Sequence, residues 1–228
     1  MAIKYNYEME QGTEAWFAAR LGLLTASEMK HIITAKKLEP ANNDKTRAHV
    51  YELAAQRISQ YVEPSYVSDD MLRGREDEID ALEVYSEHYD RVKRIGFVTN
   101  DKWGFKLGFS PDALVGEDGI IEVKGRRQKF QVETILNNAM PEEYMMQVQT
   151  GLLVTERKWC DFISYSAGLP MATIRVFPDE VVQNAIVAAA QSFEEKVGEM
   201  LNQYQERLSD KDARLIETER RIELEITV

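Results

Sequence analysis

The spacing of apolar residues along the chain predicts an alternation of helices and strands. Near the N-terminus, Thr13 can cap a short helix that runs through Arg20, with Trp16 and Phe17 facing inward and Gly22 ending it. An irregular connection is expected at 62 to 71 because it contains a proline. Further helices are predicted at residues 25 or 27 to about 34, at 47 to 61, from 72 onward and at 141 to 155.

Two helices carry a clear stripe of apolar residues at spacings of three and four. The helix that begins at residue 72 would bury Ile79, Leu82, Tyr85 and Tyr89. From residue 179 the same spacing continues for roughly six turns or more, which predicts a long amphipathic helix that packs on the core. Its apolar positions are Val182, Ile186, Ala189, Phe193, Val197, Met200 and Tyr204.

Strand-like segments lie between these helices. Segments 105 to 114 and 120 to 123 flank a polar Gly-Glu-Asp-Gly turn at 116 to 119, a pattern typical of a β-hairpin. Other strands are predicted at 95 to 100, 159 to 165 and 172 to 177.

The pattern predicts one α/β domain over residues 1–228, with a mixed central sheet flanked by helices. Its core would span about 72–177, and the C-terminal helix and tail about 179–228. The sequence shows no internal repeat, low-complexity stretch or linker. The last apolar residues, Ile222, Leu224, Ile226 and Val228, alternate with Glu and Thr, so this segment could add to a sheet edge or pair with another subunit.

Composition is that of an ordinary soluble protein, with 44% hydrophobic and 29% charged residues in a chain of 228. Cys160 stands alone, which excludes a disulfide framework, a thiolate zinc site and a four-cysteine iron–sulfur site. The sequence has neither a signal peptide nor about 18 consecutive apolar residues, so we expect a cytoplasmic protein and no membrane partner. The scattered His31, His49 and His88 are interpreted as structural or surface residues.

The net charge of −11 argues against a protein that coats nucleic acid over a broad basic surface. An enzyme that confines its basic groups to a groove remains compatible with this charge. Basic residues do gather near the hairpin: Arg73, Arg75, Lys124, Arg126, Arg127 and Lys129.

The hairpin carries the strongest candidate chemistry. Glu122 and Lys124 are two residues apart on one strand, so they share a face, and Asp112 lies beside them on the other strand. Two carboxylates suit Mg²⁺, and a nearby ammonium can orient the attacking water or offset charge on a phosphoryl group. The alternative is a surface hairpin with a cross-strand ion pair, contributing about 1 kcal/mol or less.

Three other features are ambiguous from the sequence. Glu78, early in its helix, could complete a metal site or simply favour the helix dipole. Arg20 and the hydroxyls of Thr25 and Ser27 converge on a helix N-terminus, where they could bind an anion or merely cap the helix. The polar loop at 36 to 46 carries three lysines that could reach a duplex, or it is a solvated connection.

The order of these motifs resembles the PD-(D/E)xK nuclease core and, within it, the phage lambda exonuclease family, also called YqaJ-type viral recombinases. The matching residues span roughly 10 to 165 in the family's order. They are Trp16, Arg20-Leu21-Gly22, Thr25-Ala26-Ser27-Glu28, Gly74 and Glu78, Ser110-Pro111-Asp112, Glu122-Val123-Lys124 and Gln147-Val148-Gln149.

The resemblance implies a Mg²⁺-dependent exonuclease, with Mn²⁺ able to replace Mg²⁺, that digests one strand of duplex DNA from its 5′ end. Asp112, Glu122, the Val123 carbonyl and Glu78 would hold metal, and Lys124 would position the water. The 5′-phosphate pocket would comprise Arg20, Ser27, Ser110 and Gln147. Further DNA contacts are expected from Thr25, Lys36, Lys37, Arg75 and Arg126.

The same resemblance implies a homotrimeric ring around DNA, a single-strand annealing protein as partner, and a phage or prophage gene expressed in the bacterial cytoplasm. The chain departs from the family pattern at Gly125-Arg126, where a small residue and Pro are frequent, and at Ala113, where Gly is frequent. The acidic tail beyond about residue 205 has no identifiable counterpart. Two other functions stay open at this point: an endonuclease on the same core, and a non-catalytic DNA-binding module.

Overall fold

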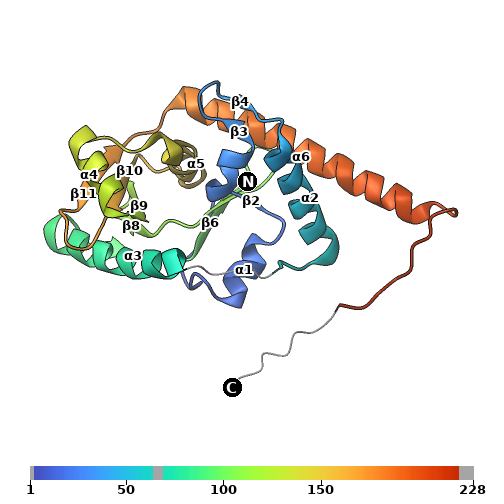
Figure 1. Cartoon of the computed structure of the whole chain (residues 1–228), viewed down its shortest axis with the longest axis horizontal. Helices are drawn as coiled ribbons and strands as arrows, with labels where there is room; N and C mark the ends of the chain where they lie inside the picture. Colours follow the sequence, from blue (N-terminus) through green and yellow to red (C-terminus); the bar gives the residue numbers. More distant parts are fainter. Residues whose placement is uncertain (1–2, 64–68, 221–228) are drawn as a thin grey trace, which may run out of the picture.

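A computed structural model describes residues 3–63 and 69–220 (Figure 1). The alternating segment at 222–228 lies outside the described residues, as does the middle of the irregular connection at 62–71. No helix within the described part of the chain is long and apolar enough to cross a membrane.

Within the described residues, the strands form two mixed sheets and a separate hairpin. The five-stranded sheet has the order β11-β10-β9-β8-β5, with β9 and β10 parallel. The four-stranded sheet has the order β1-β6-β7-β2, with β2 and β7 parallel. The strands are β1 (Lys4–Asn6), β2 (Leu24–Thr25), β3 (Ile33–Thr34), β4 (Glu39–Pro40), β5 (Val92–Lys93), β6 (Phe97–Asn100), β7 (Leu107–Phe109), β8 (Ala113–Val115), β9 (Gly119–Gly125), β10 (Trp159–Tyr165) and β11 (Ala172–Val176).

Helices flank the sheets, so the mixed α/β class predicted from the sequence is confirmed. The first and last helices begin where their caps predict: Thr13 accepts from the Trp16 amide, and Asp179 accepts from the amides of Val181 and Val182. The helices are α1 (Glu14–Arg20), α2 (Asp44–Ser59), α3 (Asp69–His88), α4 (Gln128–Asn137), α5 (Met145–Thr155) and α6 (Glu180–Ser209), with 3₁₀ helices η1 (Ala26–His31) and η2 (Glu142–Tyr144).

Two predicted elements are wrong in their extent. The helix expected at 25 to 34 is the short η1, because Ile33 and Thr34 leave it to pair with β4. The strand expected at 105 to 114 breaks at residues 110 to 112, where the chain passes from β7 in one sheet to β8 in the other. The Ser-Pro-Asp segment therefore connects the two sheets, outside the bounds of both strands.

Four residues expected to pack on the core are exposed instead. Phe17, Ile79, Tyr89 and Tyr204 are 46%, 48%, 64% and 40% exposed. On α3 the buried side is formed instead by Ala81, Leu82 and Tyr85. Helix α4 was not predicted at all, and its apolar residues also face outward.

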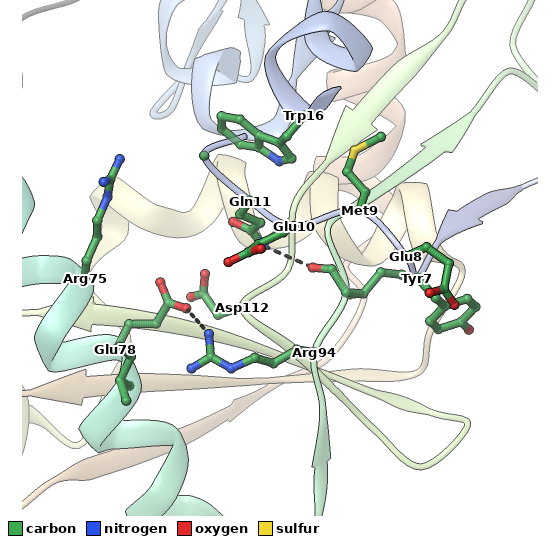
Figure 2. Close-up of a pocket in the computed structure, with 13 residues that line it drawn as sticks. Tyr7, Glu8, Met9, Glu10, Gln11, Trp16, Arg75, Glu78, Arg94 and Asp112 are labelled. Carbon is green, nitrogen blue, oxygen red and sulfur yellow. Dashed lines mark hydrogen bonds and ion pairs between the residues drawn. The ribbon is translucent and has the colours of Figure 1, made fainter. Parts of the chain in front are cut away.

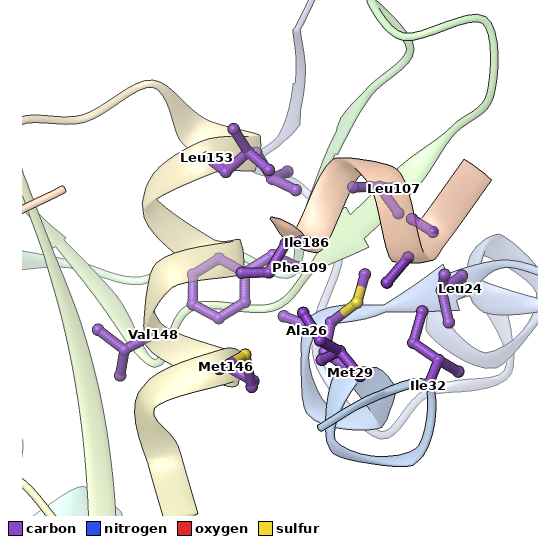
Figure 3. Packing of buried hydrophobic residues seen from close by; sticks show 14 of the residues in the cluster. Leu24, Ala26, Met29, Ile32, Leu107, Phe109, Met146, Val148, Leu153 and Ile186 are labelled. Carbon is purple, nitrogen blue, oxygen red and sulfur yellow. The ribbon is translucent and has the colours of Figure 1, made fainter. Parts of the chain in front are cut away.

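Helices α3 and α5 cover opposite faces of the five-stranded sheet (Figure 1). Ile121 and Val123 of β9 pack with Tyr85 of α3, whereas Ile120 belongs to the larger core that contains Val148 of α5. Figure 3 shows this larger core, in which η1, β7, α5 and α6 meet. Because side chains alternate along a strand, the even-numbered residues of β9 face α5.

A pair of charged residues ties α6 to the N-terminal part of the fold. Arg57 on α2 donates to both carboxylate oxygens of Glu194 on α6, each at 2.8 Å. The Arg57 Nε also donates to the Gly22 carbonyl at 2.7 Å, and Gly22 has a φ of +63° that favours glycine. This contact fixes the turn between α1 and β2, which carries Arg20 toward the candidate site.

Candidate active site

The β8–β9 hairpin sets the geometry of the acidic residues. Its antiparallel register pairs Ala113 with Ile121, so Asp112 lies opposite Glu122. The Asp112 amide donates to the Ile121 carbonyl at 3.1 Å, which extends the ladder to the residue that carries the carboxylate. The hairpin therefore brings together two carboxylates that are distant from each other in the sequence.

Glu122 is almost fully enclosed, with 2% of its surface exposed. Its Oε1 accepts from Lys124 Nζ at 2.6 Å and from Gln147 Nε2 at 2.5 Å. Its Oε2 has no hydrogen-bond partner among the described residues. A buried carboxylate oxygen is costly to leave without a partner, so this oxygen is a ready ligand for a cation.

A cavity of about 680 Å³ opens beside Asp112. Glu78 lines it from α3, and the side chains of Glu78 and Asp112 point toward one another (Figure 2). Arg94 also lines the cavity, and its Nη1 lies 3.6 Å from Glu78 Oε1. Exposed Arg75 lies on the same wall, one turn before Glu78. The structure thus adds a third carboxylate and two guanidinium groups to the hairpin residues.

Burial and the neighbouring carboxylates disfavour the charged forms of Asp112 and Glu78. Burial, followed by the charges of Glu122 and Glu78, raises the pKa of Asp112 well above its ordinary value. Burial also raises the pKa of Glu78, which Arg94 partly offsets. Burial acts to lower the pKa of Lys124, but Glu122 and Asp112 outweigh it and raise that pKa overall, so Lys124 stays charged.

These residues fit a divalent cation. The mutual repulsion of the carboxylates and the unpartnered Glu122 oxygen are both relieved by a bound positive charge. No group of three or more His, Cys, Asp or Glu side chains in the described parts of the chain is arranged to hold a metal by itself. The candidate ligands are thus few: Asp112, Glu122 and the Val123 carbonyl, with Glu78 close by. Such a partial set suits Mg²⁺, which keeps several waters.

A second group of polar side chains lies next to the acidic residues. Ser110, two positions before Asp112, accepts from Arg20 Nη1 at 3.4 Å, and Arg20 Nη2 donates to Thr25 Oγ1 at 3.2 Å. Thr25 Oγ1 lies 3.3 Å from the hydroxyl of exposed Ser27. Burial lowers the pKa of Arg20, and Glu28 partly offsets that effect. Arg20, Ser27 and Ser110 therefore belong to one network that can donate to an anion. Thr25 links them, while its own hydroxyl donates to Glu28 Oε2 at 2.8 Å.

Gln147, the fourth residue expected in the phosphate pocket, instead donates to Glu122 and so joins the acidic group. The proposed DNA-contact residues are distributed more widely. Lys36 and Lys37 are exposed between β3 and β4, away from the residues that line the cavity. Arg126 is buried, and its Nη1 donates to Glu143 Oε1 and to the Tyr144 hydroxyl, each at 2.8 Å.

Sequence reasoning missed several residues of this site. Arg94 pairs with Glu78, and Gln11 donates to the carbonyls of Pro111 and Ile95 at 3.0 and 3.2 Å. Trp16 was expected only to face inward and to match the family motif, yet its indole contacts Ser110 of the network described above. Hydrogen bonds that span 80 or more positions in the sequence, as these of Gln11 and Trp16 do, leave no local signal by which they could have been found.

Comparisons with known proteins identify the fold and the family. The structure is similar to an alkaline exonuclease (LHK-Exo) from Laribacter hongkongensis, with a TM-score of 0.77, 30% identity, and coverage of 86% of this chain and 98% of that one. It matches the same enzyme solved in complex with dAMP with a TM-score of 0.76. A phage-related exonuclease from Haemophilus somnus 129PT shares the fold at 13% identity, with a TM-score of 0.62 and coverage of 80% of this chain and 96% of that one. No curated protein matches the sequence significantly.

Fold and family together define a nuclease of the exodeoxyribonuclease type, which acts on DNA with a divalent metal. Residues 15–158 match the YqaJ-like viral recombinase domain. This match covers more than half of the chain, and the chain therefore belongs to the YqaJ family of viral recombinases, the group of the phage lambda exonuclease.

Proposed function

We propose that this protein is a Mg²⁺-dependent exonuclease that degrades one strand of duplex DNA from a 5′-phosphorylated end. It releases mononucleotides and leaves a 3′ single strand for recombination by strand annealing. The chain acts as one nuclease domain over residues 1–228, and Mn²⁺ can replace Mg²⁺.

One observation carries the proposal: the donor network and the acidic residues are joined through a single short segment. Ser110 belongs to the network with Arg20, and Asp112 belongs to the group with Glu122. A phosphate monoester held by the network lies next to the first phosphodiester bond of its own strand. This arrangement supports cleavage from a 5′ end, and the dAMP bound to LHK-Exo is the kind of mononucleotide that such cleavage releases.

Each residue of the acidic group has a defined task in this proposal. Asp112, Glu122 and the Val123 carbonyl hold Mg²⁺, with Glu78 contributing, and the ion supplies charge to activate water and to stabilise the developing phosphoryl charge. Lys124 stays charged beside Glu122, where its ammonium can orient a water molecule or offset negative charge. Gln147 holds the Glu122 carboxylate from α5.

The proposed setting follows from the family. We assign a homotrimeric ring that encloses the duplex, a single-strand annealing protein as partner, and a phage or prophage origin with action in the cytoplasm of a bacterial host. Arg75 at the cavity is the DNA contact that the structure supports best, because it lies on the wall that carries Glu78.

A linear duplex with one 5′-phosphorylated end and one 5′-hydroxyl end tests the reaction. In Mg²⁺ the wild type should release mononucleotides from the phosphorylated end, and EDTA should stop the release. Asp112→Ala should be inactive. Asp101→Ala, which removes an exposed carboxylate outside the site, should keep wild-type activity.

Two outcomes would contradict the proposal. Cleavage of covalently closed circular duplex at the rate of linear duplex would indicate an endonuclease on the same core, because a closed circle offers no terminal phosphate. DNA that is bound but uncut with Mg²⁺ and with Mn²⁺ would indicate a binding module.

A further inference from the structure

The hydroxyl of Ser110 has a defined hydrogen-bond direction. Its Oγ accepts from the indole N–H of Trp16 at 3.0 Å and, more weakly, from Arg20 Nη1 at 3.4 Å. A serine hydroxyl has two acceptor positions and one proton. Because both neighbours can only donate, they occupy the acceptor positions. The Ser110 proton is therefore left to donate to a further group.

The indole of Trp16 is held firmly enough to set this direction. Its N–H is shared with the Gly96 carbonyl at 3.1 Å, and its ring makes an edge contact with Phe17 at 5.0 Å between centroids. Trp16 lies on α1, whose start is capped by Thr13. Its side chain is half-buried and lines the cavity beside Asp112 (Figure 2). A buried indole N–H usually finds an acceptor, and here one of its two acceptors is a residue of the site.

The same indole also orients Arg20. The guanidinium carbon lies 4.3 Å from the centre of the Trp16 ring, which is a cation–π distance. The other end of the guanidinium donates to Thr25 Oγ1, and the Thr25 hydroxyl donates in turn to Glu28 at 2.8 Å. Arg20 is thus fixed on one side by the Trp16 ring and on the other by the Thr25 hydroxyl, whose proton is already donated to Glu28.

We infer that Trp16 is the positioning residue of the terminal-phosphate pocket. Its N–H turns the Ser110 proton toward a phosphate oxygen, and its ring sets the plane of the Arg20 guanidinium. The groups that face the ligand then all donate, which favours a phosphate monoester, an acceptor-only anion, over a 5′-hydroxyl. This inference rests on the proposed function, because it explains how that site selects the 5′-phosphorylated end.

Trp16→Phe tests the inference, since it keeps an aromatic ring beside Arg20 and removes the N–H. The quantity to measure is the ratio of kcat/KM on 5′-phosphorylated ends to kcat/KM on 5′-hydroxyl ends. We expect this ratio to fall about tenfold, mainly through a higher KM for the phosphorylated end, as for the loss of one hydrogen bond in a charged site. Trp103→Phe is the matched control, because Trp103 packs on Phe105 at a ring distance of 6.2 Å, and it should keep the wild-type ratio.

A double-mutant cycle with Ser110→Ala separates positioning from general packing. If Trp16 acts through Ser110, adding Trp16→Phe to Ser110→Ala should lower the ratio little further. Independent, additive losses in the cycle would overturn the inference. The inference would also be overturned if Trp16→Phe kept the wild-type ratio while Arg20→Ala lost the preference for 5′-phosphorylated ends.

A binding measurement covers the case in which Trp16→Phe does not fold. Replacing both Trp103 and Trp159 by Phe leaves Trp16 as the only one of the three tryptophans. In EDTA, its fluorescence should change on titration with a 5′-phosphorylated hairpin duplex and not with the 5′-hydroxyl form. Saturable binding without a change would overturn the inference. A wild type that makes no distinction between the two ends would instead remove the proposed function, and the inference with it.

Discussion

At the scale of single residues, the cluster of Asp112, Glu122 and Glu78 favours the binding of a cation at the expense of the stability of the folded protein. Burial and the charges of Glu122 and Glu78 raise the pKa of Asp112, so its ionised form is disfavoured in the folded protein. The Val123 amide donates to Asp112 Oδ2 at 2.6 Å, and an asparagine could keep that bond through its side-chain oxygen. The charge of the Asp112 side chain, more than its shape, therefore destabilises the folded protein.

Asp112→Asn should raise the melting temperature in EDTA near neutral pH and abolish nuclease activity. Removing one charge from the crowded group relieves repulsion, and a gain of 1 kcal/mol corresponds to about 2–4 °C for a chain of this size. Added Mg²⁺ should stabilise the wild type and not the variant. Scanning calorimetry measures both effects, with Asp101→Asn as the exposed control. A lower melting temperature in EDTA would show that the Asp112 charge is stabilising.

Lys124→Ala should leave DNA binding nearly intact and lower the cleavage rate about 10²-fold or more, on the scale of losing a positioned electrostatic group. The ammonium contacts Glu122 and faces the ring of Tyr144 at 5.4 Å, so it is fixed on two sides. Single-turnover cleavage measures the effect. Lys129→Ala is the control, because Lys129 is an exposed lysine on α4. Full activity of the Lys124 variant would exclude a catalytic role.

At the scale of elements, α4 is turned with polar residues inward. Gln131 and Thr134 are buried, whereas Phe130, Val132 and Leu136 are exposed. Gln131 Nε2 donates to the carbonyls of Ser164 and Pro170 at 3.0 and 2.7 Å, and its Oε1 accepts from the Ser164 hydroxyl at 2.5 Å. These bonds join α4 to β10 and to the loop that follows β10.

Gln131→Leu should destabilise the protein by about 2–4 kcal/mol, because it leaves the buried Ser164 hydroxyl and the carbonyls of Ser164 and Pro170 without this partner. Denaturant unfolding measures the change. Gln128→Leu, at the exposed start of the same helix, is the control and should shift stability by less than about 0.5 kcal/mol. Equal effects of the two substitutions would mean that the buried amide network adds nothing beyond helix packing.

The orientation of α4, with polar residues buried and apolar residues exposed, illustrates which features of the fold could be predicted from the sequence and which could not. The hairpin around Glu122 was predictable because a polar turn and a period of two are local signals that fix the register. The apolar stripe of α6 was predictable for the same reason. Which side of α4 is buried, and whether Phe17 is exposed, depends on the neighbour against which each helix packs. No local sequence pattern encodes that neighbour. The contacts of Trp16 and Arg94 likewise arise only after distant segments are brought together.

At the scale of the whole molecule, the net charge of −11 is unusual for a protein that acts on DNA. The basic groups near the candidate site are few: Arg20, Arg75 and Arg94, with Lys124 held by Glu122. Acidic residues Glu8 and Glu10 line the same cavity. Phosphate contacts supply most non-specific affinity for DNA, so this surface alone would hold a duplex weakly.

A ring that encloses the duplex resolves this difficulty, because enclosure keeps the enzyme on its substrate without a broad basic surface. We therefore expect a homotrimer, with a mass of three times the 26.2 kDa of one chain. Light scattering at micromolar concentration, coupled to size-exclusion chromatography, measures this mass. High salt should weaken DNA binding more than it weakens the trimer, since salt screens phosphate contacts strongly. A monomeric mass would exclude the ring, and retention on DNA would then have to come from the few basic groups around the cavity.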